Sequence, residues 1–237
     1  MEHYTQADFD ALMAARQSPC QWIDLPQGDW SGVDFGGADW LTIAPWSILG
    51  DRVHIGANCR IGEGCQFGND CIIGDKCEFD SRCTFGDRCI VGVRCQFGSC
   101  TMGNACSIGD WFTVIYSCEL GNNCTLGDFC SLGENCELGD ECELGSDCNA
   151  HNHFHIGARS VIDRDLVVKS WCHIGDDCII GGDAMFGDRC TFGERCTFGE
   201  GCIIGYMCNI PDTCTFGEGC EIAGEYDAPW AVDEGDE

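Results

Sequence analysis

A six-residue unit, Cys-x-(Ile/Leu/Phe)-Gly-x-x, recurs through most of the chain and constrains its fold more than any other feature. Its central apolar residue recurs every sixth position from Leu49 to Phe97; one residue is then dropped, and the series runs from Met102 to Phe216. Cys stands two positions earlier, so both side chains point to the same side of a short strand. The pattern predicts an all-β parallel β-helix solenoid. The Gly after each strand is expected to adopt a positive φ in the turn.

The repeat in residues 43–223 resembles the hexapeptide-repeat family of parallel β-helices. The resemblance implies a three-sided, left-handed helix in which each coil consists of three repeat units, with one strand in each unit. About 30 units would make roughly ten coils, and a rod of roughly 48 Å at the usual spacing of neighbouring strands. Members of that family usually carry Val, Ala, Ser or Thr at the position where this chain has Cys.

The remaining segments divide around this repeat. Residues 1–22 are expected to hold a short capping helix over 5–17, with Thr5 and Asp8 as a capping box, docked on the open end of the solenoid, and a linker. Residues 23–42 carry four Asp five apart, each followed by a large apolar residue: Leu25, Trp30, Phe35 and Trp40. This spacing resembles pentapeptide-repeat proteins, and it implies about one coil of a four-sided right-handed β-helix. Residues 224–237 form an acidic tail.

Composition limits the partners. The chain has 40 Asp plus Glu against 12 Lys plus Arg, a net charge of -28, which disfavours direct binding to nucleic acid or an anionic membrane and favours basic proteins. We expect the 24 cysteines to be reduced thiols that fill small core positions. No signal peptide or transmembrane run is recognised, so a cytoplasmic location is expected. No cofactor is predicted.

Histidines are the candidate catalytic residues. Counting by six places His155 on an outward strand position and His173 directly above it, because the two are three repeat units apart in the sequence. Hexapeptide-repeat acyltransferases use an interface His as general base, so the resemblance gives His155 or His173 that role if the chain is an enzyme. His151, His153 and His155 are a weaker candidate zinc set.

Two apolar sets are predicted to face outward. Val167, Met185 and Ile203 recur at intervals of three repeat units on one face, and Val161 and Ile179 have the same separation on another. A half-buried strand normally carries polar residues outside, so we expect these stripes to be homo-oligomer contacts. Trp111 and Phe129 are also three units apart, at one corner, where exposed aromatic rings are candidate anchors for a partner.

Between Cys95 and Ala158 the chain has no Lys or Arg but nine acidic residues. Eight of them join Trp111 and Phe129 as the predicted partner-binding set: Glu119, Asp128, Glu134, Glu137, Asp140, Glu141, Glu143 and Asp147. Several pentapeptide-repeat proteins are acidic rods that imitate duplex DNA. The repeat region here carries roughly one net charge per 3 Å, against about one per 1.7 Å in the duplex, so only a local face could approach the density of DNA.

The sequence therefore predicts a non-enzymatic acidic β-helix that binds and inhibits a basic nucleic-acid-handling protein. The alternatives are a hexapeptide-repeat acyltransferase and a passive structural rod.

Overall fold

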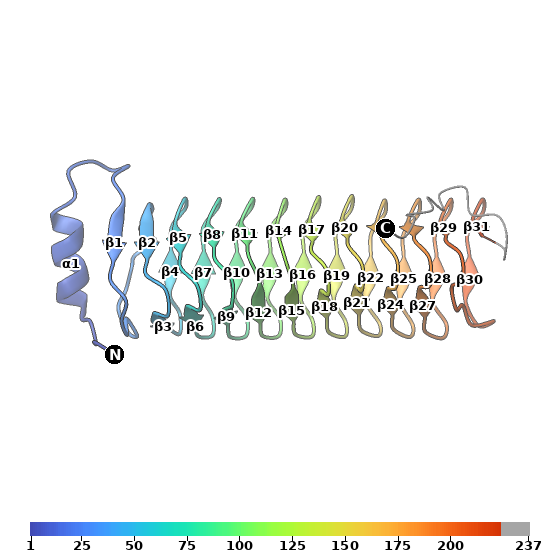
Figure 1. Cartoon of the computed structure of the whole chain (residues 1–237), viewed down its shortest axis with the longest axis horizontal. Helices are drawn as coiled ribbons and strands as arrows, with labels where there is room; N and C mark the ends of the chain where they lie inside the picture. Colours follow the sequence, from blue (N-terminus) through green and yellow to red (C-terminus); the bar gives the residue numbers. More distant parts are fainter. Residues whose placement is uncertain (224–237) are drawn as a thin grey trace, which may run out of the picture.

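The computed structural model describes residues 1–223, in which one helix precedes 31 short strands arranged in three parallel sheets (Figure 1). The helix is α1 (Gln6–Ala14). Sheet A has nine strands: β3 (Ile48–Gly50), β6 (Gln66–Phe67), β9 (Cys83–Phe85), β12 (Cys100–Met102), β15 (Cys118–Leu120), β18 (Glu137–Leu138), β21 (His155–Ile156), β24 (His173–Ile174) and β27 (Thr191–Phe192). Sheet B has twelve: β1 (Ile23–Leu25), β2 (Leu41–Ile43), β5 (Arg60–Ile61), β8 (Glu78–Phe79), β11 (Gln96–Phe97), β14 (Thr113–Val114), β17 (Ser131–Leu132), β20 (Asn149–Ala150), β23 (Val167–Val168), β26 (Met185–Phe186), β29 (Ile203–Ile204) and β31 (Glu221–Ile222). Sheet C has ten: β4 (His54–Ile55), β7 (Ile72–Ile73), β10 (Ile90–Val91), β13 (Ser107–Ile108), β16 (Thr125–Leu126), β19 (Glu143–Leu144), β22 (Val161–Ile162), β25 (Ile179–Ile180), β28 (Thr197–Phe198) and β30 (Thr215–Phe216).

Each coil runs from sheet A to sheet C to sheet B, and its strands pair with the coils before and after it. Partners are three repeat units apart along most of the rod, as in Val161 with Ile179. Pairs that span the dropped residue are one position closer in sequence, as in Gln96 with Thr113. The three-sided solenoid and its all-β class are therefore as predicted.

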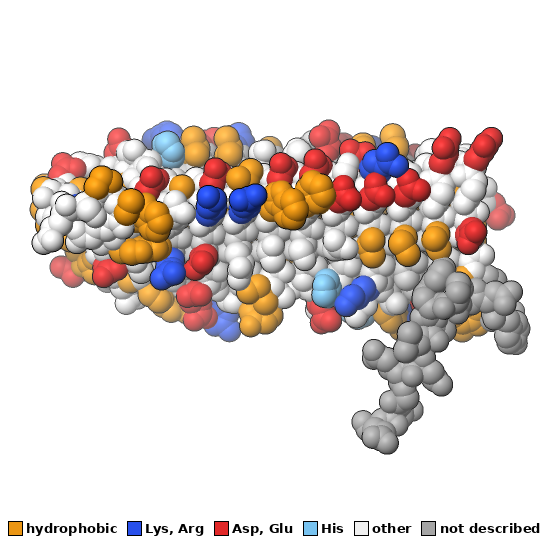
Figure 2. All heavy atoms as spheres, turned by 90° about the horizontal axis from the view of Figure 1, so that it is seen from above, with side chains coloured by type: hydrophobic (Ala, Val, Ile, Leu, Met, Phe, Trp, Pro, Cys, Tyr) orange, Lys and Arg blue, Asp and Glu red, His pale blue; other side chains and the backbone are white. Residues whose placement is uncertain are grey.

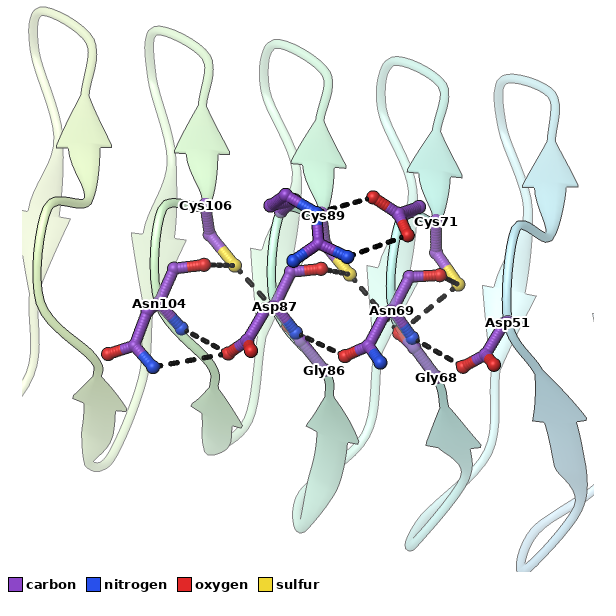
Figure 3. Close-up of polar contacts among 11 residues, drawn as sticks. Asp51, Gly68, Asn69, Cys71, Gly86, Asp87, Cys89, Asn104 and Cys106 are labelled. Atoms are coloured by element: carbon purple, nitrogen blue, oxygen red, sulfur yellow. Dashed lines mark hydrogen bonds and ion pairs between the residues drawn. The ribbon is translucent and has the colours of Figure 1, made fainter.

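The interior is a stack of thiols and apolar side chains. All 24 cysteines carry free thiols, and 20 of them are buried. Most of these thiols donate to a glycine carbonyl of the preceding coil, as Cys89 does to Gly68 at 3.3 Å (Figure 3). A serine or threonine hydroxyl could make the same bond, but the sulfur is larger and less polar. The expectation that the cysteines fill core positions is confirmed for these 20.

The expected role of the glycines after the strands is wrong. Positive φ is found two residues later, at non-glycine corner positions such as Asp70 and Arg88, with φ of 58° and 57°. Gly86 has an ordinary φ, but a Cβ there would lie 2.2 Å from Asn69 Oδ1 and 2.7 Å from the carbonyl carbon of Gly68. Close contact between successive coils, not backbone conformation, therefore requires glycine.

Asp and Asn side chains form a column from coil to coil beside these glycines. Oδ1 of Asp51, Asn69 and Asp87 each accepts the backbone N–H of the next residue in the column, at 2.7–2.8 Å (Figure 3). The side chain thus supplies the coil-to-coil hydrogen bond at a point where the turn interrupts the β-ladder. The missing Cβ of the glycine leaves room for that oxygen.

The N-terminal coil differs from the expected four-sided one. Strand β1 pairs with β2 in the same register as the later coils, with Ile23 opposite Leu41. Asp29 bridges Ile48, and Ala38 bridges Ile55, so this coil has three sides like the others. Trp30 and Phe35 are buried. Trp40 instead takes a corner position with a φ of 61° and packs edge-on against Trp22.

Helix α1 covers the N-terminal end of the solenoid, as predicted (Figure 1). Phe9 is buried and packs edge-on against Phe35, with ring centroids 5.0 Å apart. The Thr5 N–H donates to Asp8 Oδ2 at 2.7 Å, which confirms the capping box. The predicted acidic tail, 224–237, lies outside the described residues.

Candidate interaction surfaces

The corners between sheets C and B form a continuous edge that we call the C–B ridge. It comprises the first three of the four residues between the two strands in each coil, and the third of them has positive φ. In chain order these third residues are Asn58, Lys76, Arg94, Trp111, Phe129, Asp147, Asp165, Asp183, Gly201 and Gly219. Figure 2 shows basic, then hydrophobic, then acidic side chains following one another along this edge.

Backbone hydrogen bonds fix the spacing of the ridge. The Arg94 N–H donates to the Asp110 carbonyl at 2.8 Å, and the Trp111 N–H donates to the Asp128 carbonyl at 2.8 Å. Oδ1 of Asp110 and Asp128 in turn accepts a backbone N–H of the next coil, at 3.0 and 2.8 Å. Each ridge side chain is therefore held about one strand spacing from the next.

The aromatic pair lies in the middle of this ridge. The rings of Trp111 and Phe129 stack with centroids 4.5 Å apart and an interplanar angle of 12°. Trp111 is 51% and Phe129 43% exposed, so the stacked pair still presents apolar surface to solvent. Exposed, pre-ordered aromatic rings are favourable anchors for a protein contact.

Charges on the ridge are segregated. The ridge residues between 109 and 219 include eight acids and a single base, Arg164. Arg164 donates to Asp183 at 2.7 Å and lies 2.9 Å from Asp165. Asp147, Glu200 and Glu218 have no ion-pair partner among the described residues. The net charge over these six coil steps is roughly one per 4 Å, using the usual strand spacing, which is close to the 3.4 Å per charge of one DNA strand.

The corner between sheets A and C has the opposite arrangement, in which signs alternate. Arg88 makes two hydrogen bonds to Asp70 at 2.7 and 2.9 Å, and Arg195 makes two to Asp177, both at 2.7 Å. These bonds from Arg88 and Arg195 lower the pKa of the Asp70 and Asp177 carboxyls below its ordinary value. Over residues 68–195 this corner carries seven acids and three bases, and five of the seven carboxylates pair with an arginine, so its charge is partly neutralised.

The predicted acidic set does not form one face. Asp128 and Asp147 lie on the C–B ridge with Trp111 and Phe129, and Glu143 lies beside them on sheet C. Glu119 and Glu137 pair in register on the outer face of sheet A. Glu134 lies at the corner between sheets B and A, while Asp140 and Glu141 lie at the A–C corner, within 3.7 and 2.9 Å of Arg159.

The histidines are placed as expected. His155 and His173 pair in register on sheet A, with ring centroids 4.7 Å apart. Partial burial, and secondly the neighbouring His155, lower the pKa of His173 below its ordinary value. His153 stacks on Trp171 at the B–A corner. His151 lines a shallow depression of about 410 Å³ with Tyr116 and Glu134, and neither His155 nor His173 lines that depression.

Both apolar stripes are also found. Val167, Met185 and Ile203 pair in register on sheet B, and Val161 pairs with Ile179 on sheet C. Sheet C carries a further exposed pair, Ile72 and Ile90, which the sequence analysis did not single out. These stripes remain candidate contacts between copies of the chain.

Within residues 1–223, no group of three or more His, Cys, Asp or Glu side chains is arranged to hold a metal ion. In the same part of the chain, no helix has the length and apolar character needed to cross a bilayer.

Lys76 and Arg94 were missed by the sequence analysis, although their spacing could have revealed them. They are three repeat units apart, and Trp111 comes one coil after Arg94, with the dropped residue between them. Following that spacing along every corner would have shown the order of basic, aromatic and acidic residues.

No protein-family model, curated protein or solved structure matches the chain. Its function therefore has to be inferred from its own residues and their geometry.

Proposed function

We propose that the chain is a non-enzymatic, acidic β-helix of the hexapeptide-repeat, left-handed type that binds and inhibits a basic nucleic-acid-handling protein. The binding element is the acidic part of the C–B ridge, which would occupy the nucleic-acid groove of the partner. The observation that carries this proposal is the charge spacing of the ridge, roughly one net charge per 4 Å, which is close to the spacing along one DNA strand.

Rigidity supports the same proposal. The ridge carboxylates project from a backbone that is hydrogen-bonded from coil to coil, so little conformational entropy is lost when a partner binds. Arg and Lys side chains that normally contact phosphates could pair with carboxylates at a similar spacing. The A–C corner would contribute less to the contact because most of its carboxylates already pair with arginines.

A capture experiment tests the proposal. The immobilised protein is incubated with cell extract at about 50 and 500 mM salt, and bound proteins are identified by mass spectrometry. We expect a basic nucleic-acid-binding protein that is captured only at low salt, because screening weakens exposed charge contacts, and that is released by added duplex DNA.

Two matched triple variants locate the binding face. Asp183→Asn with Glu200→Gln and Glu218→Gln removes three charges from the ridge and should abolish capture. Glu119→Gln with Glu134→Gln and Glu137→Gln removes three charges from sheet A and the B–A corner and should preserve it. Equal loss in both variants would indicate a general charge effect. Loss only in His155→Ala or His173→Ala would instead favour the acyltransferase alternative.

A further inference from the structure

We propose that the C–B ridge is a docking site for a second copy of this chain, in antiparallel orientation, with a two-fold axis between Trp111 and Phe129. This inference does not rest on the proposed function. It concerns the stretch of the ridge from Lys76 to Asp165, whereas the variant that tests partner binding changes residues beyond it.

The order of residues along the ridge is self-complementary about that axis. Arg94 lies one coil before Trp111, and Lys76 lies two coils before it; Asp147 lies one coil after Phe129, and Asp165 two coils after it. In an antiparallel pair, a residue a given number of coils before the axis faces the residue the same number after it. Arg94 of each copy would therefore face Asp147 of the other, and Lys76 would face Asp165.

The charges of the ridge are incompletely satisfied within one chain. Lys76 and Arg94 occupy successive coils and carry the same sign, and neither makes an ion pair with any residue in 1–223. Asp147 is likewise unpaired there, while Asp165 has only Arg164, which it shares with Asp183. On the A–C corner, by contrast, arginines such as Arg88 and Arg159 each bond a carboxylate of the adjacent coil. A second copy would supply the opposite charges that the ridge lacks.

The centre of the proposed contact is apolar. Trp111 of one copy would face Phe129 of the other, and each brings a half-exposed ring that is already stacked and ordered. Val93 and Ile90, beside Arg94, are 36% and 48% exposed and extend this apolar surface. An aromatic centre flanked by charged pairs is the usual arrangement of a specific protein contact.

Orientation follows from the charges. Antiparallel copies match basic with acidic residues on both sides of the axis. Parallel copies in the same register would place Lys76 and Arg94 against the same residues of the other copy, and like charges opposed across an interface repel each other. By the same count, Asp183 would face Asn58 of the other copy, which carries no charge.

Two charge-reversed variants give a decisive test by sedimentation velocity over a range of protein concentrations at low salt. Lys76→Glu with Arg94→Glu makes both arms of the ridge acidic, and Asp147→Lys with Asp165→Lys makes both arms basic. We expect each variant alone to have a dimer dissociation constant raised on the order of 100-fold. An equimolar mixture of the two should form a heterodimer, because each acidic arm then faces a basic one.

Controls separate the ridge from other contacts. Arg52→Glu with Lys169→Glu makes the same charge change away from the ridge and should leave dimerisation unchanged, and circular dichroism confirms that all variants are folded. Trp111→Ala should weaken the dimer. The proposal is overturned if the wild-type chain stays monomeric, if the mixed variants do not associate, or if Met185→Glu disrupts dimers that the ridge variants leave intact.

Discussion

At the scale of the residue, the space available for each side chain determines which residue occupies each position of the repeat unit. The inward positions take Cys or a larger apolar residue, and the position after the strand takes Gly because the adjacent coil lies against it. The corner residue adopts a left-handed conformation that costs an L-residue about 1–2 kcal/mol. Its N–H nevertheless finds a carbonyl in the next coil, as Ala105 does with Asn122 at 2.8 Å.

Two substitutions with opposite expected effects on the free energy of unfolding test whether the glycine is required for steric reasons. Gly86→Ala should lower the free energy of unfolding by about 1–3 kcal/mol, because its Cβ would overlap Asn69 and the backbone of Gly68. Ala105→Gly should raise it by up to about 1 kcal/mol, because glycine relieves the strain of a φ of 55°. Chemical denaturation measures both. A neutral Gly86→Ala together with a destabilising Ala105→Gly would contradict the steric explanation.

Thiol reactivity is the second test at this scale. Burial raises the pKa of Cys65 to about 11 and that of Cys136 to about 12, so the reactive thiolate is scarce near neutral pH. In the native protein a thiol reagent should modify exposed Cys20 quickly, then the half-buried Cys208, Cys214 and Cys220. The remaining 20 should react only on unfolding, for a total of 24. Rapid reaction of more than four thiols in the folded state would refute the burial of the interior thiols.

At the scale of the element, the strands could be predicted from the sequence but the neighbours of each turn could not. The alternation of buried and exposed residues within a six-residue unit is local, so it identifies strands such as β18 and β19 directly. The overlap that excludes a Cβ at Gly86 involves Asn69 and Gly68, a full coil earlier in the chain, which local pattern does not reveal. Trp40 depends on the coil in the same way, because its position is a corner in a three-sided coil.

The predicted partner-binding acids show the same limit of local sequence pattern. Glu137, Glu141 and Glu143 are close in sequence, but they lie on sheet A, at the A–C corner and on sheet C. One repeat unit carries the chain from one side of the rod to the next, so neighbours in sequence seldom share a face. Residues one full coil apart do, which is why the paired histidines and apolar stripes were predicted correctly.

Helix α1 provides a prediction at this scale. Phe9→Ala should lower the free energy of unfolding by about 3 kcal/mol, since it removes a buried ring from the end of the core. It should also expose the unpaired edge of the first coil, which invites further strand pairing. Light scattering should then detect species larger than a dimer. Asp10→Ala, an exposed change on the same helix, is the control and should alter neither stability nor mass.

At the scale of the whole molecule, stability reflects a balance between neutralised and unneutralised charge. The ion pairs of the A–C corner are exposed, and such pairs contribute about 0–1 kcal/mol each. Against them stands the mutual repulsion of a chain with a net charge of -28, which destabilises the compact state. The two effects respond oppositely to salt, because screening weakens attraction and repulsion alike.

Repulsion should dominate, because acids exceed bases by more than three to one. We therefore expect the melting temperature to rise as NaCl increases from about 10 to 300 mM, over which range the Debye length falls from roughly 30 Å to below 10 Å. Thermal unfolding should be followed at a low protein concentration, so that pairing of copies does not contribute. The variant Asp183→Asn with Glu200→Gln and Glu218→Gln should melt at a higher temperature at low salt, and its melting temperature should depend less on NaCl, because it carries three fewer negative charges on one ridge.

Choline chloride in place of NaCl should give the same rise in melting temperature, since screening does not depend on the identity of the cation. A melting temperature that falls with salt would mean that the ion pairs of the A–C corner outweigh the repulsion along the C–B ridge.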